Sequence, residues 1–326
     1  MIELPPRLAV RLRAELHRTP SSQWVPNARA LSERYRGTRD GTPLVRTALD
    51  ALSYAALLMP ATYAQLDGAL RATQQRTPNF APASLLDLGS GPGTAVWAAM
   101  SRFSSLERAT TVERDPHLDA LARILHGAHE VPVQQLQDDL TTSQQWPLHD
   151  LVVIGHVLNE ISVAQRIDLI TRAWAATAHT LIIVEPGTSA FFPMLTTIRQ
   201  TLIDLGAHVV APCTHCGTCP MVDGWCHFAT KIARPDFQRL ARGATLPYEE
   251  AKYSYIAVSR IPIAYSGARV MHDSTTHKGY ITLEHCSARG IVSSDVPKRH
   301  RDAYRLARDA QWGSWLADST LFPSDA

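Results

Sequence analysis

The sequence predicts an α/β fold built on a doubly wound parallel sheet, and two observations support this prediction. Between Ser84 and Thr188, short apolar segments alternate with longer segments of helical periodicity. This alternation is typical of a parallel sheet that has helices on both faces. A glycine-rich turn, Gly89-Ser90-Gly91-Pro92-Gly93-Thr94, follows the first apolar segment and precedes a helix. Ligands of such folds bind at the carboxyl ends of the strands, so the turn marks the expected ligand site.

The composition is that of an ordinary globular protein. The chain has 326 residues, of which 45% are hydrophobic and 19% charged, and its formal net charge is +2. No apolar run reaches the roughly 18 residues that span a bilayer, and the first residues lack a secretory apolar segment. We therefore expect a cytosolic monomer with no membrane partner. Disulfides are not expected in that compartment, which makes metal binding by the cysteines more plausible.

Residues 1–78 are expected to form a helical N-terminal region. Three leucines spaced four residues apart predict the first helix, and an apolar segment at 48–58 predicts a later one. A basic segment with one tyrosine lies between them. It is either a solvated connector or a patch that contacts phosphate, and its candidate contacts are Arg34, Arg36 and Arg39.

Residues 79–260 are expected to form the α/β domain, with a cysteine-rich, metal-binding insertion at 211–230. A late strand at 249–260 resembles the antiparallel part that closes many such sheets. The expected parallel strands are Leu85–Leu88, Thr110–Asp115, a third that ends at Asp138-Asp139, His149–His156 and Thr180–Thr188.

Two ligands compete for the glycine-rich turn. A dinucleotide site has the pattern G-x-G-x-x-G, but here the third glycine comes one residue early and Pro92 interrupts the pattern. The form D-x-G-x-G-x-G instead resembles the S-adenosylmethionine loop of class I methyltransferases. On that resemblance, Asp87 receives the ammonium group of the ligand and Glu113 holds its ribose. Asp138 or Asp139 would then contact the adenine amine.

The cysteines form the least random feature of the chain. Four of the five lie between Cys213 and Cys226, in the pattern C-x2-C-x2-C-x6-C, and Cys286 lies downstream. Zinc prefers two C-x2-C pairs that a longer loop separates. Three ligands on one loop and a fourth from elsewhere are commoner for an iron–sulfur cluster. The spacing alone leaves an iron–sulfur cluster, zinc and free thiols open.

Residues 261–326 are expected to form a small C-terminal unit. The segments 268–271 and 279–286 predict a β-hairpin, a helical stretch follows, and 311–326 are expected to be a partly loose tail. Three arginines of the helical stretch share one face at i, i+4 and i+7. The candidate phosphate contacts of this unit are Lys298, Arg299, Arg301, Arg305 and Arg308.

Several motifs together resemble the methyltransferase-like protein 17 family and its bacterial relatives, over nearly the whole chain from about Ser32 to Trp312. The motifs are Asp87–Thr94, His156-Val157-Leu158-Asn159-Glu160, Val184–Thr188, Cys213-Thr-His215 with Cys219-Pro220, Cys226-His227-Phe228, and Tyr304–Gly313.

This resemblance implies a class I (Rossmann-like) S-adenosylmethionine-dependent methyltransferase fold with N-terminal helices, a cysteine-rich insertion and a small C-terminal β unit. It also implies contact with small-subunit rRNA or the immature small ribosomal subunit, in the cytoplasm of a bacterium or the mitochondria of a eukaryote. The implied cofactors are S-adenosylmethionine and a [4Fe–4S] cluster. The cluster ligands would be Cys213, Cys219, Cys226 and Cys286, whereas Cys216 departs from the family pattern. Ser90, Thr94 and His156 join the cofactor-binding candidates.

No catalytic base is assigned from the sequence. The fourth strand ends in His156-Val157-Leu158-Asn159-Glu160, not in the Asn-Pro-Pro-Tyr type of loop that base-amine methyltransferases use. Two functions therefore stay open. One is an rRNA methyltransferase, and the other is a catalytically inactive assembly factor with a structural or sensing metal cluster. A small-molecule methyltransferase with a zinc knuckle is a third, weaker alternative.

Overall fold

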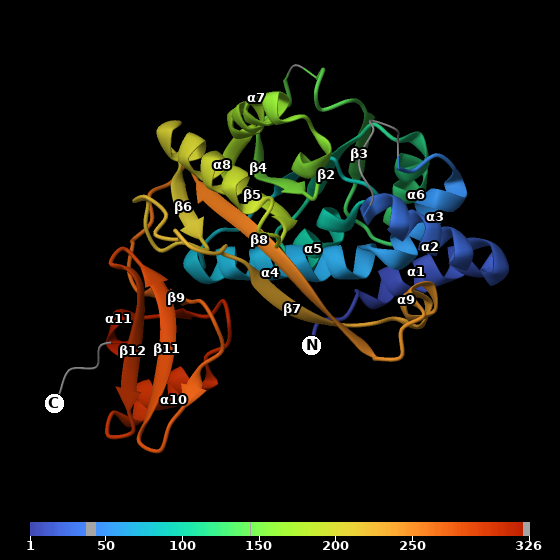
Figure 1. Cartoon of the computed structure of the whole chain (residues 1–326). Helices are drawn as coiled ribbons and strands as arrows, with labels where there is room; N and C mark the ends of the chain where they lie inside the picture. The colour runs from blue at the N-terminus through green and yellow to red at the C-terminus, as the bar shows by residue number, and fades with distance from the viewer. Residues whose placement is uncertain (37–43, 144, 322–326) are drawn as a thin grey trace.

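The computed structural model describes residues 1–36, 44–143 and 145–321, and their strands form two separate sheets (Figure 1). The larger sheet has the order β3-β2-β1-β4-β5-β8-β6, in which β1 to β5 are parallel and β8 is antiparallel to both neighbours. This order is that of the Rossmann-like methyltransferase fold. Its strands are β1 (Ser84–Leu88), β2 (Arg108–Glu113), β3 (Val133–Gln137), β4 (His149–Gly155), β5 (Thr177–Pro186), β6 (His208–Ala211), β7 (Phe228–Ala233) and β8 (Tyr248–Ser259).

Helices cover both faces of the large sheet, as the alternation of strands and helices predicts. Successive residues of a strand point to opposite faces. Leu85 and Val153 accordingly pack with α4, α5 and α6, whereas Leu86 and Val152 pack with α7 and α8. The strands are thus buried on both sides, as expected for a parallel sheet. These helices are α4 (Met59–Arg76), α5 (Thr94–Arg102), α6 (Pro116–His126), α7 (Val163–Ala175) and α8 (Phe192–Asp204).

The N-terminal helices pack against the same face as α4. Leucines four residues apart on the first helix are fully buried, which confirms the predicted periodicity. The predicted connector is partly wrong, because the second helix continues through it to Arg36, and Arg39 lies outside the described residues. The helices are α1 (Pro6–His17), α2 (Ser21–Arg36) and α3 (Ala48–Leu57), and α9 (Asp236–Arg242) joins them from a later part of the chain.

Two short strands share one edge of β8. The strand β6 pairs with the end of β8 near Val258, and β7 pairs with its beginning, from Tyr248 to Tyr253. The chain leaves this edge after β6, forms the segment 212–227, and returns to the same edge as β7. Four of the cysteines lie on this segment. The segment that carries them is therefore anchored at both ends, because β6 and β7 both pair with β8.

The C-terminal unit is a five-stranded sheet covered by α10 (Figure 1). The hairpin of this sheet joins β11 to β12. The predicted hairpin joined β9 to β11 instead. These two strands do pair, but a longer connection that contains β10 separates them. The tail predicted to be loose includes β13 and α11, because Leu316 and Leu321 are buried in the core of the unit. The elements are β9 (Ala268–Val270), β10 (Thr275–Thr276), β11 (Tyr280–Ser287), β12 (Gly290–Pro297), α10 (Arg301–Asp309), β13 (Trp315–Leu316) and α11 (Asp318–Leu321).

Within the described ranges, no helix is both long enough and apolar enough to cross a membrane.

Candidate functional site

A cleft of about 820 Å³ lies at the carboxyl ends of the parallel strands, where ligands of this fold class bind. Side chains from the ends of β2, β3 and β4 and the backbone of the glycine-rich turn line it together. Six of the residues predicted from the sequence are among them: Gly89, Gly91, Glu113, Asp138, Asp139 and His156.

The glycine-rich turn is held in a conformation that requires glycine. Gly89 and Gly93 have positive φ angles of 74° and 83°. A Cβ atom on Gly89 would lie 2.3 Å from Val157, and one on Gly93 would lie 2.4 Å from the ring of His126. The amide of Gly91 donates to the Glu113 carboxylate at 2.9 Å. The turn is therefore fixed both by packing and by the acid that follows β2.

Two neighbouring buried carboxyl groups, Asp87 and Glu113, lie at the carboxyl ends of β1 and β2. Asp87 is 2% exposed, and burial together with the neighbouring Glu113 raises its pKa to about 8. Burial also raises the pKa of Glu113, whose oxygens accept from the amides of Gly91 and Asp115. A cationic group close to both would stabilise both ionised forms, although only Glu113 of the two lines the cleft. The site is thus suited to a ligand that carries an ammonium or sulfonium group.

The acids after β3 shape their own turn as well as the cleft. Asp138 accepts from the amide of Asp139 and from the hydroxyl of Ser143. Asp139 accepts from the amide and hydroxyl of Thr141, and it lies 3.7 Å from the guanidinium of Arg114. Both acids also line the cleft, and these hydrogen bonds orient their carboxylates there.

The other cofactor candidates have different places. Ser90 and Thr94 are buried, Thr94 as the first residue of α5, and neither they nor Gly93 is among the residues that line the cleft. His156 lines it with a backbone φ of 61°, in the left-handed region. Burial lowers its pKa to about 4, so its imidazole is neutral near pH 7.

Sequence reasoning missed the part of the cleft that the N-terminal helices supply. Tyr35 of α2 and Tyr54 of α3 line it together with Leu44 and Val45, and the two tyrosine rings lie 5.8 Å apart. The only local signal was an aromatic residue within a basic segment.

Sequence reasoning also missed the role of Glu185 at the end of β5. Its carboxyl group accepts from the amide of Leu158 at 2.8 Å and so holds the loop that follows β4.

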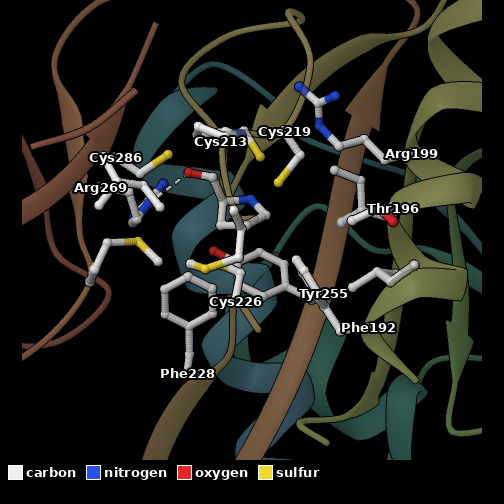
Figure 2. A pocket seen from close by; sticks show the side chains of 17 residues that line it. Phe192, Thr196, Arg199, Cys213, Cys219, Cys226, Phe228, Tyr255, Arg269 and Cys286 are labelled. Carbon is white, nitrogen blue, oxygen red and sulfur yellow. Dashed lines mark hydrogen bonds between the residues drawn. The ribbon is translucent and has the colours of Figure 1, made fainter. Parts of the chain in front are cut away.

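A second cavity, partly open to solvent, lies between α8, β8, the cysteine-bearing segment and the C-terminal sheet. The four cysteines that the resemblance selects line it together: Cys213, Cys219, Cys226 and Cys286 (Figure 2). Cys216 does not. Its sulfur accepts from the amide of Val209 and lies 2.7 Å from the hydroxyl of Tyr265. The structure thus separates the cysteine that departs from the family pattern from the other four.

Four thiols around one cavity are the kind of donor set that a thiolate-bound metal group needs. Among the described residues, however, no group of three or more Cys, His, Asp or Glu side chains is placed to hold a metal ion. Burial and the neighbouring cysteines raise the pKa values of Cys213 and Cys226, and that of Cys286 to about 12. A bound cation is what allows such thiols to ionise. Four soft sulfur ligands suit iron–sulfur clusters and zinc alike.

The candidate phosphate contacts form two separate groups. Those of the C-terminal unit are exposed on α10 and the turn before it, although Arg305 and Arg308 pair with acids of the same helix. Arg34 instead pairs with the buried Asp50 and helps to join α2 to α3. Figure 1 shows α10 far from the N-terminal helices. The basic surface of α10 is therefore the more accessible of the two.

Comparison with solved structures finds methyltransferases. Their similarity to this chain is low, so the assignment of the fold rests on the strand order. A putative RNA methyltransferase from Pyrococcus horikoshii shares 14% identity, with a TM-score of 0.40 over 72% of this chain and 96% of that one. Magnesium protoporphyrin IX methyltransferase from Synechocystis, with S-adenosylhomocysteine bound, shares 13% identity, with a TM-score of 0.42 over 71% of this chain and 93% of that one.

Comparison with curated proteins finds relatives that are longer than this chain. The human mitochondrial ribosome assembly protein METTL17 is 28% identical over 82% of this chain and 62% of its own length. The mitochondrial Rsm22-cox11 tandem protein 2 of Schizosaccharomyces pombe is 23% identical over 87% of this chain and 44% of its own length. The chain thus spans about half to two thirds of these relatives. A family model described as mitochondrial small ribosomal subunit Rsm22 matches residues 48–317. With most of its length matched, the chain belongs to this Rsm22 family.

Proposed function

We propose that this protein binds S-adenosylmethionine and acts on small-subunit rRNA during assembly of the small ribosomal subunit. The cleft is the observation that supports binding of this ligand. It combines a glycine-rich turn with Glu113, the acid that ends β2, at the carboxyl edge of the sheet. Asp87 lies buried near Glu113 and is not itself among the residues that line the cleft. Family membership supports the partner, since the human relative is named as a ribosome assembly protein.

Within this proposal, each part of the ligand meets a stated group of the chain. Asp87 receives the ammonium group, directly or through water, and its carboxyl group ionises when that cation is present. Glu113 accepts hydrogen bonds from the ribose hydroxyls, and Asp138 or Asp139 accepts from the adenine amine. Tyr35 and Tyr54 cover the cleft from the N-terminal side. The exposed arginines of α10 contact rRNA phosphates, which makes binding dependent on salt.

The proposal includes a [4Fe–4S] cluster held by Cys213, Cys219, Cys226 and Cys286. The support is that these four thiols line one cavity and that Cys216 lies outside it. The cluster would join the C-terminal sheet, which carries Cys286, to the edge of the large sheet. Its role is to hold the two sheets together, and no step at the cleft depends on it.

Metal analysis of single cysteine variants tests the ligand set. The protein is purified anaerobically, and iron, acid-labile sulfide and zinc are measured per chain. We expect iron and sulfide in the unchanged protein and their loss in each of the four variants Cys213→Ser, Cys219→Ser, Cys226→Ser and Cys286→Ser. Cys216→Ser is the matched control and should retain both. A colourless protein with one zinc ion per chain would instead reject the cluster.

Methyl transfer is the second question at the same cleft. The loop after β4 differs from the Asn-Pro-Pro-Tyr type that base-amine methyltransferases use, and both catalysis and a binding role stay open. Immature small subunits are incubated with the protein and radiolabelled S-adenosylmethionine, and ligand binding is measured in parallel. Binding without label in the rRNA supports the inactive assembly factor. Label that enters the rRNA, and is lost with Asp87→Ala, identifies a methyltransferase.

A further inference from the structure

Two buried arginines line the cavity of the four cysteines. Arg199 comes from α8 and is 5% exposed, and Arg269 comes from β9 and is 1% exposed. Figure 2 shows Arg199 on the side of Cys219 and Arg269 beside Cys286. Arginine is almost never fully buried unless it is paired. Two such residues around one cavity therefore require a reason.

The chain gives these arginines hydrogen-bond acceptors but no counter-charge. Arg269 donates to the carbonyl oxygens of Pro212 and Gly313, at 2.9 and 2.8 Å. Arg199 donates to the carbonyl oxygen of His215 at 2.8 Å. Nη2 of Arg269 and Nε of Arg199 are buried without a partner. Over the described ranges, neither guanidinium forms an ion pair with a carboxylate. Carbonyl oxygens satisfy N–H groups, but a buried charge also needs an opposite charge.

Each of the two arginines lies beside at least one cysteine of the cavity. Arg269 and Cys286 stand directly opposite each other in the β9–β11 ladder, so their side chains project from the same face of the C-terminal sheet. On the other side, Arg199 lines the same cavity as Cys213 and Cys219. Each side of the cavity thus supplies one guanidinium and at least one cysteine.

We propose that Arg199 and Arg269 are the counter-charges of an anionic metal–thiolate group. This inference rests on the proposed metal binding. Four thiolates around a [4Fe–4S] core, or around zinc, leave a net charge of about −2. Two guanidinium groups balance that charge. Donors beside the sulfurs also stabilise the more reduced cluster and so raise its reduction potential. The two arginines are positioning residues that hold the metal group through its sulfurs.

Charge-removing and charge-retaining variants test this role. The changes are Arg199→Gln, Arg199→Lys, Arg269→Gln and Arg269→Lys, each made in the full chain and purified anaerobically. Arg260→Gln is the matched control, because Arg260 donates to the carbonyl oxygens of Thr177 and Trp174 and does not line the cavity. The readouts are metal and sulfide content, the midpoint potential, the rate of metal loss to a chelator, and the melting temperature.

The inference predicts a distinct pattern in these readouts. Each Gln variant should lose metal to the chelator roughly tenfold faster, as expected for one lost charge-assisted hydrogen bond, and its midpoint potential should become more negative. The Lys variants and Arg260→Gln should have rates of metal loss and midpoint potentials close to those of the protein without substitutions. If the protein binds zinc, the cluster proposal fails, and the rate of zinc loss alone tests the two arginines.

Failure of the inference can be told apart from failure of the metal proposal. Gln variants that melt at a lower temperature, but keep the potential and the chelator rate, would show that the arginines only support the fold. The cluster would stand in that case. An unchanged protein that holds no iron, sulfide or zinc would overturn both.

Discussion

Asp87 makes the stability of the protein depend on pH. Its pKa in the folded protein is about 8, well above its ordinary value, because of burial and the nearby Glu113. The unfolded chain ionises first, so the stability that depends on this group is lost as pH rises from the ordinary value through about 8. Asp87→Asn does not ionise. Its melting temperature relative to the unchanged protein should therefore increase between pH 5 and pH 9.

Thermal scans over this pH range check the prediction, with the exposed Asp223→Asn as the control. The control should differ from the unchanged protein by the same small amount at every pH. Binding of S-adenosylmethionine to the unchanged protein should also become tighter up to about pH 8, since the ligand requires the ionised carboxylate. If the difference in melting temperature between Asp87→Asn and the protein without substitutions does not vary with pH, Asp87 does not have the raised pKa described above.

Gly93 tests whether the turn depends on packing. Its φ is positive, and an added Cβ would lie 2.4 Å from the ring of His126. Gly93→Ala should lower the free energy of unfolding by about 1–3 kcal/mol, through backbone strain and the clash. Denaturant unfolding measures this. Gly279→Ala is the control, because its Cβ would meet no atom within 4 Å and its φ is not positive. Equal losses in the two variants would contradict the packing argument.

The candidate residues differ in how far the sequence predicted them. Glu113, Asp138 and Asp139 were predicted because each follows a strand, and parallel strands end at one edge. Arg199 and Arg269 were missed, because an isolated arginine is ordinarily a surface residue. A signal was present: Arg199 lies four residues after Leu195, on the buried face of α8. Its guanidinium donates to the carbonyl oxygen of His215, a partner that local spacing does not reveal.

At the scale of elements, local patterns predicted the parallel strands and the helices that follow them. The short strand β7 was missed because its residues, Phe228–Ala233, alternate between buried and partly exposed for only six positions, directly after the cysteines. Its pairing with the beginning of β8 is what makes it a strand. The same holds for β13, where two residues are ordered by β9. Short edge strands depend on partners that lie elsewhere in the sequence.

The helix α10 is the element expected to contact RNA. The triple variant Arg301→Gln, Arg305→Gln, Arg308→Gln should weaken binding to small-subunit rRNA. It should also reduce the slope of log affinity against log salt by about 1 for each lost phosphate contact. Binding measured at several salt concentrations gives the slope. The control is Arg7→Gln with Arg11→Gln, two exposed arginines of α1. An unchanged slope in the triple variant would exclude α10 from the interface.

At the scale of the whole molecule, the cysteine cavity is the junction between the two sheets. Cys286 and Arg269 come from the C-terminal sheet, and Cys213, Cys226 and Arg199 come from the side of the large sheet. The family resemblance selected the four cysteines but gave no sign that arginines would join them. Metal loss should loosen this junction and so displace α10, which packs on β11 and β12.

The affinity of the protein for immature small ribosomal subunits, with and without its metal, tests the central claim most directly. Metal-loaded protein, chelator-treated protein, Cys286→Ser and Cys216→Ser are compared by co-sedimentation at fixed salt. We predict that the metal-loaded protein and Cys216→Ser bind alike, and that chelator-treated protein and Cys286→Ser bind more weakly while the cleft still binds S-adenosylmethionine. Equal binding by all four forms, or no binding by any of them, would contradict the claim that this cavity organises a ribosome-binding surface.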